Sequence, residues 1–355
     1  MNPLIGVFYH WLGGLSSASF YVPYKGVRRW SWEIFWLTGG IVSWAIAPWF
    51  FASLQTAHLG SVLAHTPAAT LGWCVFFGAL WGLGGLTYGL TMRYLGLSLG
   101  MAVVLGLSTA FGTLLPPIVA GEFAQKMLVT TSGNVILLGI VVALLGIAVV
   151  AWAGRLKDAE LAPAEASVAI PEFAFRKGLA VAVFSGVMSS CFAYGLAAGD
   201  PIKALSAAAG TGPLWTGLPV LCVVLLGGLL TNLIWCVSLI ARNRSAGQWR
   251  GRSAADVARA TPMPLARNYA LCALGGLLWY FQFFFYTMGE SQMGRYGFSS
   301  WTLHMASIII FGTIWGFALN EWKAASAGTR TTVWAGVALL VGATAIIGYG
   351  NKIAA

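Results

Sequence analysis

Few side chains of this sequence can accept a proton or bind a polar ligand from within its long apolar segments. They are His10, Glu33, Asn232, Gln282 and His304. If those segments cross a membrane, a polar group within one is costly unless paired. Each is therefore either a functional candidate or a structural hydrogen-bonding group between helices. Because the segments contain no paired acids, no nucleophile–base spacing and no metal-ligand cluster, we expect no enzyme activity, no bound metal and no cofactor.

Two segments in the C-terminal half combine an aromatic face with one polar group. In the first, Trp279, Gln282 and Tyr286 recur at positions i, i+3 and i+7, which lie on one face of a helix. In the second, Trp301 and His304 are close to one helical turn apart. Aromatic rings beside isolated polar groups suit a ligand with both CH faces and hydroxyl groups. We interpret these five residues as substrate-binding candidates, with interhelical packing as the alternative.

Two segments in the N-terminal half have related faces. His10 and Tyr21 are eleven residues apart on one polar helical stripe. Trp81 and Tyr88 share a face of a later segment, with a glycine between them. These four residues are further substrate-binding candidates. His10 is also a candidate proton acceptor, because imidazole has an ordinary pKa of about 6.5.

Glu33 is the first candidate for coupling to a proton. It lies in the string WSWEIFW (30–36), where three tryptophans surround one carboxyl group. Desolvation by these rings favours the protonated form, so the group could take up and release a proton as its surroundings change. The alternative is structural: Ser31 is placed to cap a helix, Glu33 to favour its dipole, and Arg28 and Arg29 lie close by.

The composition requires that membrane-spanning helices position these side chains. Hydrophobic residues make up 58% of the 355 residues and charged residues 8%, against about a quarter charged in soluble domains. This excludes a soluble enzyme, and so much apolar material excludes a disordered chain. The net charge of +10 comes from short connections between apolar segments, as membrane orientation requires, so we expect no nucleic-acid partner.

Ten segments approach the roughly 20 apolar residues that a helix needs to cross a bilayer. The predicted spans are 3–23, 34–54, 71–92, 97–119, 134–153, 177–198, 213–240, 268–289, 299–319 and 332–350. The connections after odd-numbered spans contain 16 of the 20 basic residues, and the opposite side contains 4. By the positive-inside rule the odd connections are cytoplasmic, which places both termini outside the cytoplasm.

Short matches recur in the same order in the two halves of the chain. The string GGLSSASFY (13–21) is similar to GVMSSCFAY (186–194), and FGTL (111–114) to FGTI (311–314). Because each half has five spans, an odd number, the halves must insert with opposite orientation. Such inverted repeats are typical of secondary transporters, which bind substrate between the halves. The predicted parts are a first five-helix repeat at 1–160, a linker at 161–176, and a second five-helix repeat at 177–355 with a basic cytoplasmic loop at 241–267.

Four longer strings resemble a single known family. They are FYVPYKGVRRWSWEIFW (20–36), YGLTMRYLGLSLG (88–100), LGGLLWYFQFFFY (274–286) and SWTLHM (300–305). They are similar to the bacterial L-rhamnose–proton symporter family, which belongs to the drug/metabolite transporter superfamily. The resemblance runs from about residue 5 to the C-terminus.

The resemblance implies an all-α, ten-span 5+5 fold in the bacterial inner membrane and import of a 6-deoxy sugar with a proton. We expect L-rhamnose or a close relative such as L-lyxose or L-mannose, carried by alternating access. A drug or metabolite exporter on the same fold is the alternative. The expected partners are the sugar, the proton and the lipid bilayer, with no obligate protein partner. The candidates Glu33, Arg93, Gln282 and His304 lie inside these strings, and His10 lies within the stretch from about residue 5 over which the resemblance runs. The resemblance gives none of the five an individual role. One departure is Gly84-Gly85-Leu86, where the family pattern leads us to expect an amide.

Overall fold

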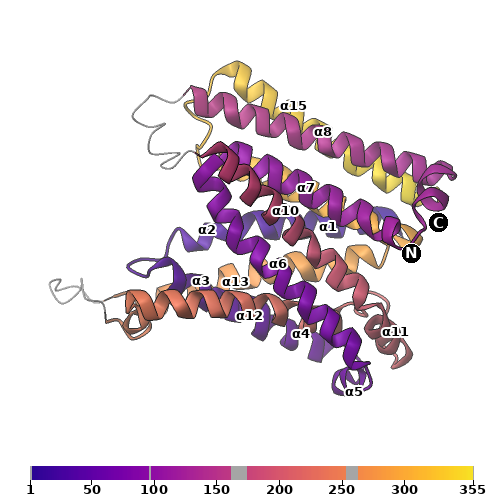
Figure 1. Ribbon diagram of the computed structural model, residues 1–355, viewed down its shortest axis with the longest axis horizontal. Coiled ribbons are helices and arrows are strands. Elements are labelled where there is room, and N and C mark those ends of the chain that lie inside the picture. Colours follow the sequence, from indigo (N-terminus) through magenta and orange to yellow (C-terminus); the bar gives the residue numbers. More distant parts are fainter. Residues whose placement is uncertain (1, 96, 161–173, 253–262, 355) are drawn as a thin grey trace.

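The computed structural model describes residues 2–95, 97–160, 174–252 and 263–354, and within these ranges the chain forms helices and no strand (Figure 1). The predicted all-α class is therefore confirmed. The helices of the first half are α1 (Pro3–Ser19), α2 (Tyr21–Tyr24), α3 (Trp32–Ile41), η1 (Val42–Ile46), α4 (Ala47–Gln55), α5 (Leu59–Ala64), α6 (Ala68–Leu95), α7 (Leu97–Val119), η2 (Ala124–Leu128) and α8 (Thr131–Ala159). Those of the second half are α10 (Phe175–Ala198), α11 (Asp200–Ala208), α12 (Leu218–Asn243), η3 (Ala246–Arg250), α13 (Leu265–Glu290), η4 (Gly294–Ser299), α14 (Ser300–Ala318) and α15 (Ala327–Lys352).

Eight stretches of helix among the described residues are long and apolar enough to cross a membrane. They are Trp32–Gln55, Ala68–Thr91, Thr131–Ala159, Phe175–Ala208, Leu218–Asn243, Leu265–Glu290, Tyr296–Ala318 and Ala327–Lys352. The other two predicted spans coincide with α1 and α7. Helix α1 has 17 residues, and the described apolar part of α7 is Val103–Val119. The chain is thus a multi-pass membrane protein.

Local sequence signals explain where several helices begin and bend. Asn2, Thr130 and Ser326 each precede a helix, and their side chains accept hydrogen bonds from amides two or three residues later. Between α3 and α4, the π-helical turn η1 directly precedes Ala47-Pro48. Proline has no amide hydrogen to donate to the preceding turn, and π turns of this kind often occur at functional sites.

Small residues let the long helices pack closely. A Cβ atom added at Gly139 of α8 would lie 2.5 Å from Ile347 Cγ1 of α15, and one at Gly146 would lie 2.9 Å from Leu340 Cγ. Such contacts drive helix association in a bilayer, where apolar side chains gain little by leaving lipid.

Glu160, directly after α8, links the same two helices at one end. Its carboxylate accepts hydrogen bonds at 2.6 Å from Thr329 Oγ1 and at 2.7 Å from both the amide and the hydroxyl of Ser326.

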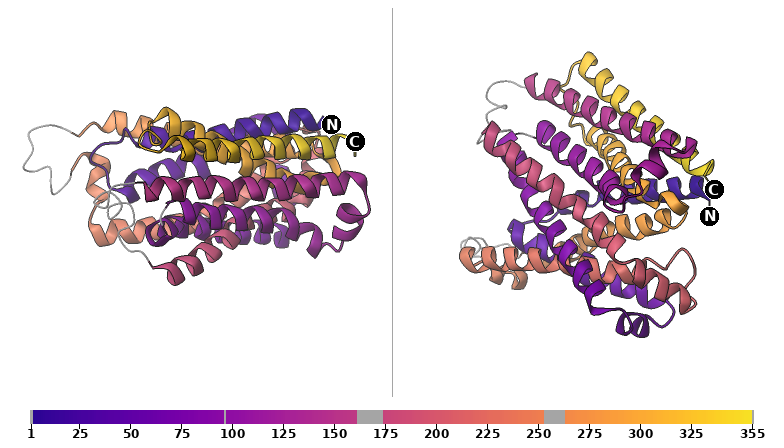
Figure 2. Two further views of the ribbon diagram at one scale, coloured as in Figure 1. Left: turned by 90° about the horizontal axis from the view of Figure 1, so that it is seen from above. Right: turned by 45° about the vertical axis from the view of Figure 1, so that its right-hand side comes forward.

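The bundle has two ends, which we call the terminal face and the linker face. The N- and C-termini lie together at the terminal face, on the right in Figure 1, and again at one end in both views of Figure 2. The linker face is the opposite end, where Glu160 and Ala174 flank one undescribed segment and Arg252 and Met263 flank the other. Of the predicted linker at 161–176 and basic loop at 241–267, residues 161–173 and 253–262 lie outside the described residues.

Candidate functional site

A cavity of about 260 Å³ lies between the helices, and we call it the central cavity. Six of the nine predicted substrate-binding residues line it: Trp81, Tyr88, Trp279, Gln282, Trp301 and His304. They come from α6, α13 and α14, which are far apart in the sequence. Parts of three of the four predicted helical faces thus meet around one space.

Aromatic rings are prominent in the cavity wall, where eight of the twenty described lining residues are Phe, Tyr or Trp. Trp279 lies against Phe20 with ring centroids 4.2 Å apart, and Trp81 meets Phe283 edge-on at 5.3 Å. Trp301 is fixed by its Nε1, which donates to the carbonyl oxygen of Ser108 at 2.9 Å. The indoles can thus act as rigid platforms for the CH faces of a ligand.

Trp36, Trp44 and Phe20 also line the cavity, and no sequence pattern identified them as candidates. Trp36 Nε1 donates to Asn232 Oδ1 at 3.0 Å, and Asn232 Nδ2 donates to the carbonyl oxygen of Gly228 at 2.8 Å. Asn232, predicted only as a polar candidate, therefore positions the Trp36 ring. The sequence signal for Asn232 was a single amide within an apolar span. Nothing in the sequence indicates that residues 36 and 232 are in contact.

Several polar atoms around the cavity have no hydrogen-bond partner within the described part of the chain. They are Trp279 Nε1, Gln282 Nε2, Ser108 Oγ and both ring nitrogens of His304. Gln282 is 3% exposed and His304 is 1% exposed. Leaving a buried polar group unpaired costs about 1–3 kcal/mol, so these atoms mark a place where a polar ligand would be stabilised.

His10 and Tyr286 lie behind the cavity wall. The His10 ring is fully buried, with its centroid 5.3 Å from that of Tyr286 and 6.4 Å from that of His304. No described residue hydrogen-bonds to either ring nitrogen of His10. The space is tight, because a Cβ atom at Gly289 would lie 2.7 Å from His10 Nε2. The two histidines and Tyr286 form one buried cluster, as their placement on facing helices α1, α13 and α14 requires.

Tyr21 is not part of the cavity lining. It is 44% exposed in α2 and meets the ring of Phe20 edge-on at 5.6 Å. Its predicted helical stripe with His10 assumes one continuous helix, but α1 ends at Ser19. Pro23 has no amide hydrogen to donate to the Ser19 carbonyl, which explains the break.

Glu33 lies outside the central cavity, at the start of α3 near the linker face. It is 4% exposed, and its Oε1 accepts hydrogen bonds from Ser245 Oγ at 2.8 Å and from Asn243 Nδ2 at 3.1 Å. These two donors lie at the end of α12 and just beyond it, about 210 residues away in the chain. The side chain of Arg93, another candidate, lies outside the described residues.

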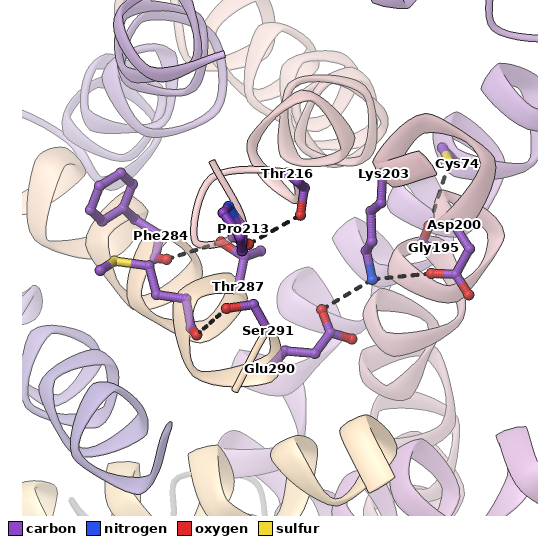
Figure 3. Close-up of polar contacts among 11 residues, drawn as sticks. Cys74, Gly195, Asp200, Lys203, Pro213, Thr216, Phe284, Thr287, Glu290 and Ser291 are labelled. Carbon is purple, nitrogen blue, oxygen red and sulfur yellow. Dashed lines mark hydrogen bonds and ion pairs between the residues drawn. The ribbon is translucent and has the colours of Figure 1, made fainter. Parts of the chain in front are cut away.

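A second cavity, of about 580 Å³, opens near the terminal face, and we call it the terminal vestibule. Lys203 of α11 lies on its wall, with Nζ 3.1 Å from both Asp200 Oδ1 and Glu290 Oε2 (Figure 3). The Lys203–Glu290 contact joins α11 to the end of α13. Tyr286 also lines this vestibule, and its ring contacts Trp301 of the central cavity at 5.9 Å.

A third cavity, of about 280 Å³, lies toward the linker face, and we call it the linker-side cavity. It shares Ser17, Phe20, Leu105 and Ile308 with the central cavity, whereas the described linings of the central cavity and the terminal vestibule have no residue in common. The central cavity thus adjoins the linker-side cavity, whereas the rings of Tyr286 and Trp301 meet where the central cavity approaches the terminal vestibule.

A multi-span helical bundle that encloses a cavity lined by aromatic rings and a few polar side chains is typical of a membrane transport protein. The chain belongs to the L-rhamnose-proton symport protein (RhaT) family, whose family model matches residues 2–353. This confirms the resemblance drawn from the four sequence strings.

Individual relatives match over almost their full length. The chain is 39% identical over 347 residues to an L-rhamnose-proton symporter of Cronobacter sakazakii, covering 98% of this chain and 97% of that protein. Proteins of the same name from Shigella boydii and Escherichia coli are 38% identical with the same coverage. These relatives are named as transporters and not as enzymes, in agreement with the residue analysis.

Proposed function

We propose that this chain imports L-rhamnose, or a close relative such as L-lyxose or L-mannose, together with a proton across the bacterial inner membrane. The observation that carries the proposal is a set of buried, unpartnered polar atoms in side chains that line an aromatic-walled cavity. The names of the relatives point to the same substrate and the same coupling ion.

The chemistry of a 6-deoxy sugar suits this cavity. Its hydroxyl groups can pair with Gln282 Nε2, Trp279 Nε1 and the His304 ring, which no described protein group satisfies. Its CH faces and methyl group can pack on the rings of Trp81 and Trp301. The proposed substrate-binding residues are therefore Trp81, Tyr88, Trp279, Gln282, Trp301 and His304. In this proposal His10 and Tyr286 orient His304 from behind, and Tyr21 supports Phe20.

The helix contacts support ten spans arranged as a 5+5 inverted repeat. Span 1 (α1) packs on spans 8 and 9 (α13 and α14), as span 6 (α10) packs on spans 3 and 4 (α6 and α7). Two further sets of contacts join a span to its counterpart in the other half: α8 with α15, and α3 and α4 with α12. A two-fold pseudosymmetry between the halves 1–160 and 177–355 would produce this pattern.

Charge supports an orientation with both termini in the periplasm. The odd-numbered connections, which contain 16 of the 20 basic residues, lead to the linker face in this arrangement. The linker face is then cytoplasmic. The central cavity would accordingly adjoin the cytoplasmic side and be closed toward the periplasm by Tyr286 and Trp301.

Transport by alternating access then requires that the periplasmic closure opens while the cytoplasmic side shuts. The Lys203–Glu290 ion pair on the terminal face joins α11 to α13 and is among the contacts that opening must change. Sugar and proton together must favour this switch more than either one alone, because otherwise their movements are not coupled.

Glu33 remains our candidate for the proton-coupling residue. An ionised carboxylate is acceptor-only, which matches its two hydrogen bonds from Asn243 and Ser245. Protonation turns one carboxyl oxygen into a donor and weakens this link between α3 of the first half and the end of α12 of the second. Proton binding would thereby loosen the two halves relative to each other. The buried histidines His10 and His304 are the alternative proton carriers.

Sugar uptake into membrane vesicles tests the proposal. We expect labelled L-rhamnose to accumulate above the external concentration when the vesicle exterior is acidic and to equilibrate when a protonophore removes the gradient. The alternative, an exporter of drugs or metabolites, predicts gradient-driven efflux of apolar compounds and no sugar accumulation.

A further inference from the structure

Three glycines in the middle of α6 have different surroundings. A Cβ atom at Gly82 would approach Thr231 Oγ1 of α12 more closely than any real contact, and one at Gly84 would lie 2.6 Å from the Ser189 amide of α10. These two glycines therefore let α12 and α10 pack against α6. A Cβ atom at Gly85 would meet nothing within 4 Å.

Gly85 faces the central cavity between two aromatic residues. Trp81 precedes it by four residues and Tyr88 follows it by three, and all three line the cavity. The missing side chain therefore leaves a gap between two rings on one helical face. Since no neighbouring helix occupies this gap, the gap is part of the space available to a ligand.

Helix packing does not require glycine at position 85. Glycine inside a helix is less favourable than alanine because its backbone loses more freedom on folding. What glycine provides at this position is space in the cavity wall.

The residues that line the cavity from α6 differ in polarity from those of α13 and α14. The described lining residues of α6 are aromatic residues and glycines, whereas α13 and α14 provide the Gln282 amide and the His304 imidazole. A sugar whose hydroxyls pair with α13 and α14 presents its less polar end to α6. In a 6-deoxy sugar the least polar substituent is the methyl group at C6.

We infer that Gly85 determines how large a group at C6 of the sugar the site accepts. In this arrangement the C6 methyl group packs over Gly85 between Trp81 and Tyr88. The inference rests on the proposed sugar transport and adds a residue that determines substrate choice. It predicts that a side chain at position 85 competes with the group at C6 for the same space.

Three sugars that differ only at this position provide the test. L-lyxose has no C6, L-rhamnose has a methyl group and L-mannose has a hydroxymethyl group. Their affinities are measured by calorimetry on the purified full-length protein and on Gly85→Ala. One extra methyl group in a filled site is expected to weaken the binding of L-rhamnose roughly 5- to 150-fold and that of L-mannose at least as much. L-lyxose is expected to change by less than about 3-fold, because it leaves that space free.

Gly89→Ala is the matched control. Gly89 lies one turn further along α6, a Cβ atom there also meets nothing within 4 Å, and the residue is not among those lining the cavity. Gly89→Ala is expected to leave the affinities for all three sugars within about 2-fold of those of the wild-type protein, as for a surface substitution. Tyr88→Leu, which widens the same gap, is expected to raise the affinity of L-mannose relative to L-rhamnose, and it tests the inference independently of how Gly85→Ala folds.

The outcomes are distinct. Equal weakening of the three sugars by Gly85→Ala, or an unchanged sugar ratio in Tyr88→Leu, overturns the inference while leaving sugar transport intact. A wild-type protein that binds none of the three sugars overturns the proposed function and the inference with it.

Discussion

Replacing Gln282 by leucine should separate ligand binding from folding. The amide is 3% exposed, and its Nε2 has no hydrogen-bond partner within the described residues. If it pairs with a sugar hydroxyl, losing that hydrogen bond costs about 1–3 kcal/mol, which is roughly a 5- to 150-fold loss of affinity. Leucine has a similar volume and removes an unpaired buried amide, so the stability of the ligand-free protein should stay unchanged or rise.

The assay combines equilibrium binding of labelled L-rhamnose with thermal unfolding of the same purified protein. Gln55→Leu is the control, because Gln55 is exposed at the end of α4 and should leave affinity unchanged. Trp279→Ala should also weaken binding, since it removes a cavity platform and an unpartnered donor. Unchanged affinity in both Gln282→Leu and Trp279→Ala would place the sugar site away from α13. A fall in stability in Gln282→Leu would instead show that the amide holds helices together.

Three further predictions follow from other parts of the molecule. Glu33→Gln mimics the protonated carboxyl group, so vesicles with this variant should exchange sugar across the membrane but not accumulate it; accumulation under a proton gradient would make a histidine the leading proton carrier. Cysteines introduced at Ser61 and Gly247 should react with impermeant reagents from opposite sides, Ser61 from the periplasm, and reaction from one side only would contradict the inverted repeat. Hydrogen bonds from the start of α15, that of Thr329 first, hold the pKa of Glu160 below its usual range. The Glu160 carboxylate should therefore stabilise the folded protein at pH 7, and this contribution should be lost as the pH falls below about 4. Thermal unfolding of wild type and Glu160→Gln across this range measures it, and a difference that persists at low pH would contradict the reasoning.

The sequence predicts most of the helices and much of the cavity, because both depend on periodic patterns within single segments. Apolar length locates most ends of the long helices to within about four residues. The predicted start at 213 precedes that of α12 by five residues, the predicted end at 153 precedes that of α8 by six, and the predicted start at 332 follows that of α15 by five. Helical spacing correctly groups Trp279 with Gln282, and Trp301 with His304, on faces that reach one cavity.

The remaining site residues depend on contacts between distant segments, which no local pattern specifies. Trp36 lies in the cavity wall because its indole donates a hydrogen bond to Asn232 of another helix. Glu33 is buried where its carboxylate accepts a hydrogen bond from Ser245. Tyr21 leaves the predicted face because the helix ends at Ser19 ahead of Pro23. Trp44 reaches the cavity from a π-helical turn, a geometry that helical spacing of 3.6 residues cannot anticipate.

Proton movement on addition of sugar tests the central claim most directly. Purified protein is reconstituted into lipid vesicles in weakly buffered medium, and the external pH is recorded as L-rhamnose is added without any imposed gradient. Symport predicts that the medium becomes more alkaline as sugar carries protons inward, and that a protonophore abolishes the change. L-rhamnose uptake with no movement of protons would contradict coupling, and the absence of both would contradict sugar transport itself.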